Sequence, residues 1–445
     1  MSEKRLLIVS PHFPPVNAAD MHRVRVLLPY LIEEGWVVEV LAVEPEQIAF
    51  PQDTWLVDGL PTNIKVHHVK AFGLGWSRIF ALGGLGLRAL RSTGKTGNRL
   101  LASGSFDLVY FSTTVFDLLR LGPGWKKKYG VPFVLDYQDP WVNDYYREHP
   151  HVIPPGGRLK YAIVSAMHRW TEPRVMRHCL GFTSVSPAYP KQLDSRYPWL
   201  HSVPRLVQPF PGAQRDFDRV SSSKVTNRFF EATDGNIHWV YIGVVIAGMY
   251  PALRALFTAI TTAMPVADRQ RLRVHFIGTS YAPSGQAVPK VLPLAFECGL
   301  GDQVDEQTDR IPYVEALRCL LDAHALLAIG SDDPGYTASK IFPYLLARKP
   351  LLAIYHEQSS ITSLIREVGG AVCVAMTDPP NLNVLALDIA SCWVSGSQYS
   401  VTLPLDVEAF EPYTDQGAAK ALSQFFHRCL SDASKPTVKK KCPIS

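Results

Sequence analysis

Hydroxyl groups and a lysine stand immediately before an apolar segment of helical spacing in the stretch 335–354, GYTASKIFPYLLARKPLLAI. A helix amino terminus carries free N–H groups and a partial positive charge, so it attracts anions, most often phosphates. We expect Ser339 to cap a helix whose first residue is an exposed Lys340, with Tyr336 and Thr337 in the same loop reaching the bound ligand. The alternative is an ordinary N-cap beside a solvated lysine.

Acidic and imidazole side chains form a second candidate group, in the first half of the chain. Asp136 and Asp139 end an apolar strand, where a carboxylate can bind hydroxyl groups or act as a base. An aspartate before Pro140 is also a turn former. His22 lies near the start of a predicted helix and is a candidate catalytic residue, and Asp20 is there either as a helix cap or as an acid. The constellation predicts chemistry on hydroxyl groups.

Two arginines of the same predicted helix, Arg23 and Arg25, are two positions apart and therefore point to different faces. We expect one of them to face the ligand and the other to lie on ordinary surface.

The segment 71–104 combines cations and apolar residues without a single acid. Arg78, Arg88 and Arg91, among its cations, could lie on an anionic membrane surface, each contributing about 1 kcal/mol. The alternative is a pair of helices packed on a sheet with the arginines in water. Glycines within it weaken any single long helix.

Apolar strands that alternate with helices must position these groups. The first half shows strands at 5–10, 36–43, 63–69, 107–112, 131–137 and 181–186, with an amphipathic helix at 21–35. After an irregular stretch the pattern restarts with strands at 238–243, 273–278, 325–330 and 350–355. Strands that are apolar throughout indicate parallel sheets covered on both faces. Three of the four strands in the second half end in glycine or at a turn, as strands do before a ligand-binding loop. Gly243 is one of these terminal glycines.

The pattern predicts an α/β protein of two doubly wound, Rossmann-like domains that face each other across a ligand-binding cleft. We place one domain at 1–205, a second at 206–410 and a helix at 411–432 that returns to the first domain. The basic tail 433–445 is expected to be disordered.

Composition narrows the class of protein. The 445 residues are 47% apolar and 19% charged, with a net charge of +5, too small a surplus for a dedicated nucleic-acid binder. The seven cysteines are scattered and never in CxxC spacing, as expected for reduced thiols in a cytoplasmic protein without a metal site. MSEKRLLIVS leads directly into a strand, so no signal peptide is expected. The apolar run 237–253 contains glycines and a proline, and we interpret it as strand, turn and helix, not as a membrane span.

Several common motifs are missing. No GxGxxG opens the first helix, which disfavours a dinucleotide dehydrogenase, and GxxxxGK[ST], HExxH and GxSxG are also absent.

Segments along residues 5–375 resemble family-4 glycosyltransferases of the GT-B fold. They are HFPPVNAADMHRVRVLLPYLIEEGWVVEVLAV, DLVYFSTTVFDLLRLGPGWKKKYGVPFVLDYQDPW, SVSPAYPKQL and the Ser339–Lys340 stretch. The resemblance implies a retaining, metal-independent transferase with no cofactor beyond its nucleotide-sugar co-substrate. It places Phe13, Asp20, Arg23 and Arg25 on the acceptor side, Asp139 and His22 at the reaction, and Gly243 with the Ser339–Lys340 stretch at the donor diphosphate.

The chain also departs from that family. Pro343 stands where the family has a ribose-binding glutamate, and no basic pair follows the first strand of the second domain until Arg254. From the resemblance we nevertheless expect a glycosyltransferase of envelope or extracellular polysaccharide synthesis that acts on a saccharide or lipid-linked acceptor. We expect it to be cytoplasmic and peripheral on the inner face of the cell membrane. The alternatives are a non-catalytic GT-B protein that binds a sugar or a partner enzyme, and a nucleotide-sugar epimerase.

Overall fold

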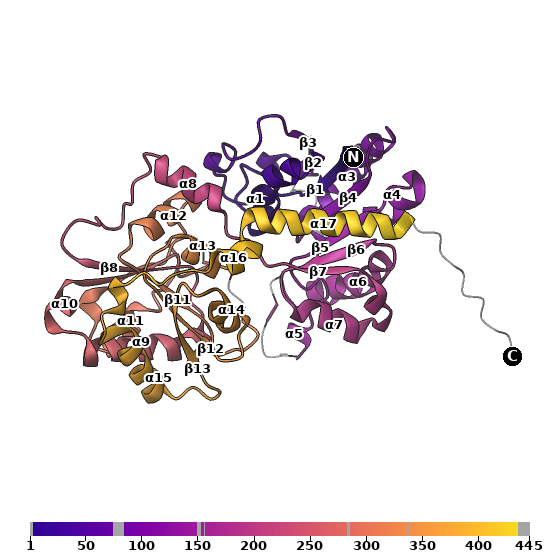
Figure 1. Cartoon of the computed structure of the whole chain (residues 1–445). Helices are drawn as coiled ribbons and strands as arrows, with labels where there is room; N and C mark the ends of the chain where they lie inside the picture. The colour runs from indigo at the N-terminus through magenta and orange to yellow at the C-terminus, as the bar shows by residue number, and fades with distance from the viewer. Residues whose placement is uncertain are drawn as a thin grey trace. The chain divides into compact units, whose positions relative to one another are not determined.

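The computed structural model of the chain describes residues 3–73, 84–148, 153–154, 156–282, 285–336 and 339–434. The chain divides into two compact units (Figure 1): unit 1 comprises Met1–Phe210 with Asp415–Ser445, and unit 2 comprises Pro211–Thr414. The predicted site residues Arg78 and Thr337, and the tail after residue 434, lie outside the described residues.

Unit 1 is built on one parallel sheet of seven described strands in the order β3-β2-β1-β4-β5-β6-β7. The strands are β1 (Lys4–Val9), β2 (Trp36–Val43), β3 (Lys65–Val69), β4 (Leu108–Ser112), β5 (Phe133–Tyr137), β6 (Gly181–Ser184) and β7 (Arg205–Val207). Its helices are α1 (Ala19–Glu33), α3 (Leu85–Leu101), α4 (Leu121–Tyr129), α5 (Tyr145–Glu148), α6 (Arg158–Met176), α7 (Ala188–Arg196) and α17 (Asp415–Ser434). The central strands are almost wholly buried, which explains their continuous apolar sequences.

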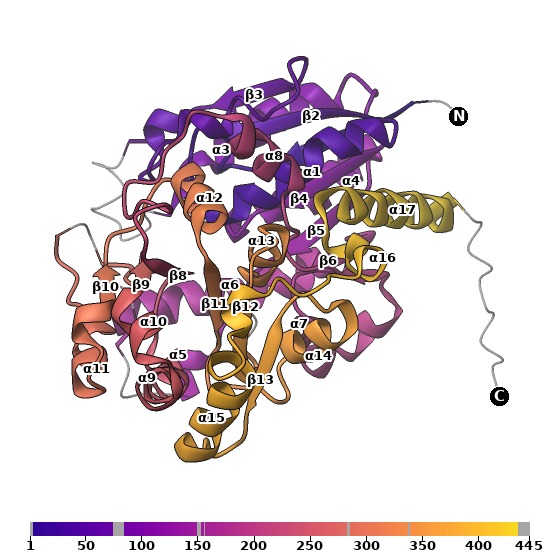
Figure 2. The same ribbon diagram turned by 60° about the vertical axis from the view of Figure 1, so that its left-hand side comes forward.

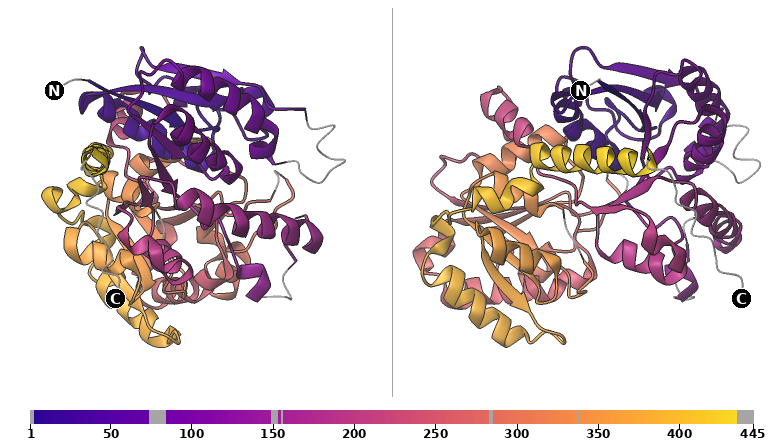
Figure 3. Two further views of the ribbon diagram at one scale, coloured as in Figure 1. Left: turned by 90° about the vertical axis from the view of Figure 1, so that its right-hand side faces the viewer. Right: turned by 45° about the vertical axis from the view of Figure 1, so that its right-hand side comes forward.

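The C-terminal helix α17 belongs to unit 1, where it lies beside α1 (Figures 1 and 3). The indole nitrogen of Trp36 donates to the Ser423 hydroxyl at 3.0 Å, and the Gln208 amide donates to the Ala418 carbonyl at 2.7 Å. The ring of Phe426 also contacts Tyr110, with centroids 5.0 Å apart. The end of the chain therefore completes the core of the unit in which the chain begins.

Unit 2 repeats the architecture with a parallel sheet of six described strands in the order β10-β9-β8-β11-β12-β13 (Figure 2). The strands are β8 (Ile237–Ile242), β9 (Leu272–Ile277), β10 (Val304–Gln307), β11 (Ala325–Ile329), β12 (Leu351–His356) and β13 (Val372–Met376). Its helices are α8 (Gln214–Ser222), α9 (Tyr250–Ala263), α10 (Val266–Arg271), α11 (Leu292–Glu297), α12 (Tyr313–Asp322), α13 (Ile341–Leu346), α14 (Ser360–Val368), α15 (Leu382–Ile389) and α16 (Val407–Phe410). The α/β class and the two Rossmann-like sheets predicted from the sequence are confirmed.

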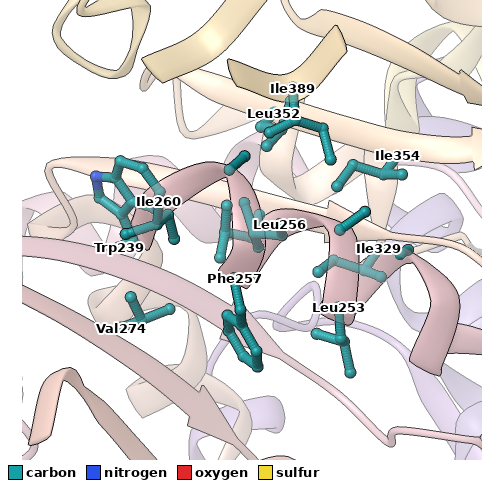
Figure 4. Close-up of a cluster of buried hydrophobic side chains, with 14 of the residues drawn as sticks. Trp239, Leu253, Leu256, Phe257, Ile260, Val274, Ile329, Leu352, Ile354 and Ile389 are labelled. Carbon is teal, nitrogen blue, oxygen red and sulfur yellow. The ribbon is translucent and has the colours of Figure 1, made fainter. Parts of the chain in front are cut away.

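Helix α9 supplies much of the unit 2 core. Its apolar positions recur at helical spacing, so that Leu253, Leu256 and Ile260 are all buried. Figure 4 shows these side chains among those of the sheet, including Trp239 of β8. The apolar run 237–253 is thus strand, turn and helix start, as the sequence predicts. Among the described residues, no helix is both long and apolar enough to cross a membrane.

The described part of the basic segment forms α3, one helix in spite of its glycines. An added Cβ on Gly97 would lie 2.2 Å from the Trp125 ring, so glycine allows α3 to pack closely. The prediction that Arg88 lies on a membrane surface is wrong. Arg88 is buried and donates to the carbonyls of Phe72 and Gln47 at 3.0 and 3.1 Å, whereas Arg91 is exposed.

Candidate functional site

Glycines follow two strands at the carboxyl edge of the unit 2 sheet. Gly243 follows β8 with a φ of 134°, a conformation that residues with a side chain rarely adopt, and its N–H donates to the Ile277 carbonyl at 2.8 Å. Gly278 follows β9 with a φ of 75°. Ligands of doubly wound folds bind at this edge of the sheet.

Lys340 lies half-buried against this edge, with its ammonium group packed on a tyrosine. Its Nζ donates to the Tyr241 hydroxyl at 2.5 Å and lies 4.2 Å from the centroid of that ring. A Cβ added to Gly243 would approach Nζ to 3.1 Å, so the glycine leaves room beside the lysine. Within the described part of the chain, no carboxylate forms an ion pair with Lys340.

Burial lowers the pKa of Lys340 to about 7. A buried ammonium group without a counter-charge is costly, and an anion placed beside it would offset that cost and raise the pKa again. A lysine perturbed in this way, next to an open backbone turn, is therefore a candidate anion-binding group.

Several tyrosines lie close together at this edge, around the Tyr241 partner of Lys340. The Tyr344 hydroxyl accepts from the Ile242 N–H at 2.7 Å and donates to the Ile242 carbonyl at 3.0 Å, which ties α13 to the end of β8. Tyr336 is half-buried, and burial raises its pKa to about 12. The Tyr355 hydroxyl on β12 is fully buried and has no hydrogen-bond partner among the residues that the structure describes. An unsatisfied buried hydroxyl is costly in free energy, and a ligand at this edge could supply its partner.

The structure corrects three expectations about this stretch. Helix α13 begins at Ile341, and Ser339 and Lys340 belong to the turn before it. The Ser339 side chain makes no capping hydrogen bond; its carbonyl accepts from the Phe342 N–H at 3.2 Å instead. Lys340 was expected to be exposed, and it is half-buried instead, because its ammonium group packs on the Tyr241 ring. Pro343 lies in the first turn of α13.

The carboxyl edge of the unit 1 sheet carries a histidine–aspartate pair. The Asp20 carboxylate, at the start of α1, lies 2.8 and 3.0 Å from Nδ1 of His12 in the loop after β1. Both residues are buried. Hydroxyls of Thr113 and Thr114 also donate to Asp20, at 2.9 and 3.4 Å. Because Nδ1 is held by the carboxylate, His12 has Nε2 left for a ligand. Asp20 therefore orients a histidine and does not cap the helix.

Two carboxyl groups here have opposite pKa shifts. Burial alone would raise the pKa of Asp20, but the hydrogen bond and charge of His12, with the bonds from Thr114 and Thr113, outweigh it and lower the pKa. The pKa of Asp139 is raised, first by desolvation and second by the charge of Asp20. Asp139 is nevertheless exposed, so its carboxyl group is accessible to a ligand.

The neighbouring charged side chains, Asp136 and Arg23, bind to each other and to other groups of the protein. Asp136 accepts from Ser112, Thr183 and Gln138, each at 2.7 Å, and forms an ion pair with Nε of Arg23 at 3.0 Å. Arg23 also donates to the carbonyls of Gln208 and Pro209 at 2.8 and 3.1 Å.

This network and its neighbours correct three predicted roles. Arg23 and Arg25 are both buried, which contradicts the expectation of one ligand-facing and one surface arginine. His22 has both ring nitrogens engaged, Nε2 with Asn17 at 3.1 Å and Nδ1 with Arg25 at 3.4 Å, so it is poorly suited to act as a base.

His12 is the residue that the sequence analysis missed. Its signal was available, because SPHFPP directly follows an apolar strand of a parallel sheet, and such loops meet at the ligand-binding edge.

Phe13, the next residue, lines a pocket of about 810 Å³ together with Pro14 and Pro15. Glu44, Glu46 and Asp58 also line it. Its apolar lining from β3 and the preceding loop is Val57, Leu60, Pro61, Ile64 and Val66. The arrangement suits a ligand with an apolar part and polar groups.

Comparisons with known proteins give the fold. No family model matches the chain, and no curated protein matches it. Solved structures do align over nearly the whole chain. The glycosyltransferase from Rickettsia africae has a TM-score of 0.58 at 11% identity, covering 97% of this chain and 100% of that one.

Two other solved structures show the same likeness. HepE from Anabaena, in complex with UDP and glucose, has a TM-score of 0.55 at 13% identity and covers 96% of this chain and 100% of its own. The UDP-forming trehalose-phosphate synthase from Burkholderia xenovorans has a TM-score of 0.58 at 10% identity, with 97% and 100% covered. At such identities the likeness shows the fold alone: the chain has the GT-B architecture of two Rossmann-like domains.

Proposed function

We propose that the protein transfers a sugar from a nucleotide-sugar to a hydroxyl group of a saccharide or lipid-linked acceptor. The observation that carries the proposal is Lys340, a half-buried ammonium group at the ligand edge of unit 2 that pairs with no carboxylate among the described residues. The glycosyltransferases of this fold, among them HepE with its bound UDP and glucose, make a nucleotide-sugar the natural anion for that position.

On this proposal Lys340 neutralises the departing diphosphate. A donor diphosphate carries about two negative charges, and a preorganised cation stabilises the charge that develops on its leaving oxygen. Gly243 lets the phosphates approach the backbone, and the unsatisfied Tyr355 hydroxyl is a second donor. Tyr336, Thr337 and Ser339 remain proposed contacts of the sugar or phosphates. We propose that the reaction needs no metal, so EDTA should leave turnover unchanged.

In unit 1 we propose that Asp139 and His12 bind the acceptor hydroxyl and that the Phe13 pocket holds the apolar part of the acceptor. The resemblance to family-4 enzymes favours transfer with retention of the anomeric configuration. The His12–Asp20 pair favours a second candidate, transfer with inversion, since inversion needs a base for the acceptor proton. Asp20 would then stabilise the imidazolium that forms.

We also propose peripheral contact with an anionic membrane surface on the cytoplasmic side, in keeping with an envelope polysaccharide or lipid-linked acceptor. Arg91 on the outside of α3 supports it, whereas Arg88 is used inside the unit. Cosedimentation with acidic vesicles that weakens as salt rises, and is lost in Arg91→Glu, would support the contact. Equal binding to neutral vesicles would oppose it.

The decisive experiment is turnover of UDP-, GDP-, dTDP- and ADP-sugars, with and without acceptor, with the product anomer read by NMR. Transfer or donor hydrolysis supports the proposal, and the anomer separates retention from inversion. Epimerised donor formed without acceptor would indicate an epimerase. Tight nucleotide binding without any turnover would indicate a non-catalytic binding protein.

A further inference from the structure

A basic pocket lies at the amino-terminal edge of the unit 2 sheet. It has a volume of about 580 Å³ and is lined by Ile237, the first residue of β8, by His324 and Pro350, which directly precede β11 and β12, and by the segment that contains Ser400 and Thr402. The donor-side edge with Gly243 and Lys340 is at the other end of the same strands. The pocket is therefore separate from the proposed donor site.

Two cations of this pocket have no partner in the described part of the chain. Arg348 and Lys349 line it, and neither forms an ion pair or a hydrogen bond through its side chain. The acid that lines the pocket, Asp322, is engaged by Arg318. Burial lowers the pKa of Lys349, with Asp322 opposing and Arg318 adding to the shift. The pocket therefore has an excess of positive charge.

His324 adds a neutral donor. Its Nδ1 accepts the His238 N–H at 3.1 Å, which fixes the ring proton on Nε2. Burial, followed by the charges of His238 and Lys349, lowers the pKa of His324 and keeps the ring neutral. The hydroxyls of Ser400 and Thr402 complete a set of donors around the two cations.

The backbone of Arg348 is the least expected feature. Arg348 follows α13 in the left-handed conformation, with a φ of 52°. Glycine is the low-energy residue at this position after a helix, and a residue with a Cβ is strained there. The chain thus keeps an arginine in the lining of the pocket at a cost in stability, as is common for strained residues at ligand sites.

We propose that this pocket binds the phosphate group of a small phosphorylated metabolite through Arg348, Lys349 and the His324 Nε2–H. A guanidinium group offers paired donors that match phosphate geometry, and the hydroxyls of Ser400 and Thr402 suit a polyol attached to the phosphate. The volume is that of a small-molecule site and exceeds the needs of inorganic phosphate alone.

The test is calorimetric titration of the full chain with glucose 6-phosphate and inorganic phosphate, with glucose as the neutral control. The parent should bind both phosphates saturably and not glucose. Arg348→Gly, Arg348→Ala and Lys349→Met should each weaken binding about tenfold or more, the loss of one charge-assisted contact. Arg348→Gly should also raise the melting temperature by about 2 °C, and Arg348→Ala should not, because alanine keeps the backbone strain.

Two further variants separate this pocket from other sources of the signal. Lys340→Met should bind glucose 6-phosphate as the parent does, whatever becomes of the proposed sugar transfer, and Arg91→Gln on α3 is the control for total charge. The proposal is overturned if the parent binds neither phosphate, or if the Arg348 and Lys349 variants bind as tightly as the parent. Binding to phosphatidic acid vesicles without binding to glucose 6-phosphate would overturn the small-molecule assignment.

Discussion

The buried charges of the two units differ in one respect, which is whether the protein supplies their partners. In unit 1, Asp136 has three hydrogen-bond donors and the Arg23 ion pair, and Arg23 has two carbonyls besides. In unit 2, Lys340 has one tyrosine hydroxyl and, as far as the structure describes the chain, no carboxylate. A saturated charge network holds a fold together, whereas an enclosed charge that lacks its counter-charge indicates a ligand that brings one.

The same contrast separates residues within unit 1. Asp20 and Asp136 are both buried at the ends of neighbouring elements, and both were candidates from the sequence. Asp136 uses its oxygens on hydroxyl, amide and guanidinium groups, none of which acts as a base near neutral pH. Asp20 uses its oxygens on His12, and His12 has Nε2 left over. The partners of the two carboxylates therefore distinguish them: Asp20 leads to an imidazole nitrogen that can still bind a ligand, and Asp136 does not.

The largest effect on stability is expected where the partners are complete. Arg23→Met removes the cation and leaves Asp136 buried without its ion pair, so the free energy of unfolding should fall by about 3–5 kcal/mol. Urea denaturation followed by tryptophan fluorescence measures it, with Arg91→Gln as the exposed control, expected within about 0.5 kcal/mol of the parent. A small loss in Arg23→Met would mean that the network is not what holds α1 in place.

Lys340→Met should give the opposite pattern, a loss of function with a gain in stability. Turnover should fall by about 100-fold or more, as when one preorganised electrostatic donor is lost, and nucleoside diphosphate affinity should fall with it. The melting temperature should rise, because methionine keeps the packing on Tyr241 without a buried charge. Lys290→Met, on an exposed lysine of the same unit, is the control. Unchanged nucleotide affinity in Lys340→Met would refute the anion assignment.

The pKa of Lys340 predicts how nucleotide binding depends on pH. The free protein loses the lysine proton as pH rises through about 7, while a bound diphosphate should hold it on, so binding above pH 7 takes up a proton. Affinity should then weaken by up to about tenfold for each pH unit between 7 and 9. The terminal phosphate, whose second pKa is about 6, is largely ionised above pH 7 and adds little slope of its own. Titrations in buffers of different ionisation enthalpy would detect the proton uptake.

The stability of the ligand-free protein should show the linked effect. Because the pKa of Lys340 in the folded chain lies below its usual 10.5, the unfolded chain holds the extra proton between about pH 7 and 10.5. The contribution of this residue to stability should therefore rise with pH across that window. Lys340→Met should lose both this rise and the pH dependence of binding. A parent whose nucleotide affinity stays flat from pH 7 to 9 would contradict the assigned protonation state.

Most of the fold could be predicted because its strands are buried on both faces. Segments such as WVVEVLAV and ALLAIG are apolar throughout, so they stand out without any partner being known. The strands that were missed include the three-residue edge strand β7 and the polar edge strand β10, VDEQ, whose pairing depends on the neighbouring strand more than on their own residues.

The site was harder to predict, because local spacing does not show which partner a polar side chain finds. Arg23 and Arg25 look alike in the sequence, yet the first pairs with Asp136, more than a hundred residues away. His22 was preferred to His12 on its position near a helix start, although it is His12 that Asp20 holds. The burial of Lys340 depends on Tyr241, a residue of another strand, and no pattern around Ser339 indicates it.

The smallest effect is expected at Ser339, where the sequence and the structure disagree. A serine cap is worth about 1 kcal/mol, so the capped helix expected from the sequence would lose that much stability in Ser339→Ala. In the structure the Ser339 side chain makes no cap hydrogen bond, and its carbonyl, which alanine keeps, receives the Phe342 N–H. Ser339→Ala should therefore change the free energy of unfolding by less than about 0.5 kcal/mol. Ser359→Ala is the matched control, since the Ser359 hydroxyl does accept from the Ile361 N–H at the start of α14 and its loss should cost about 1 kcal/mol. If the two variants lose equal stability, the serine caps α13 after all, and the turn before Lys340 is part of the helix. If Ser339→Ala keeps its stability but binds the nucleotide more weakly, the hydroxyl contacts the ligand, and Lys340 has the second donor that the proposed donor site requires.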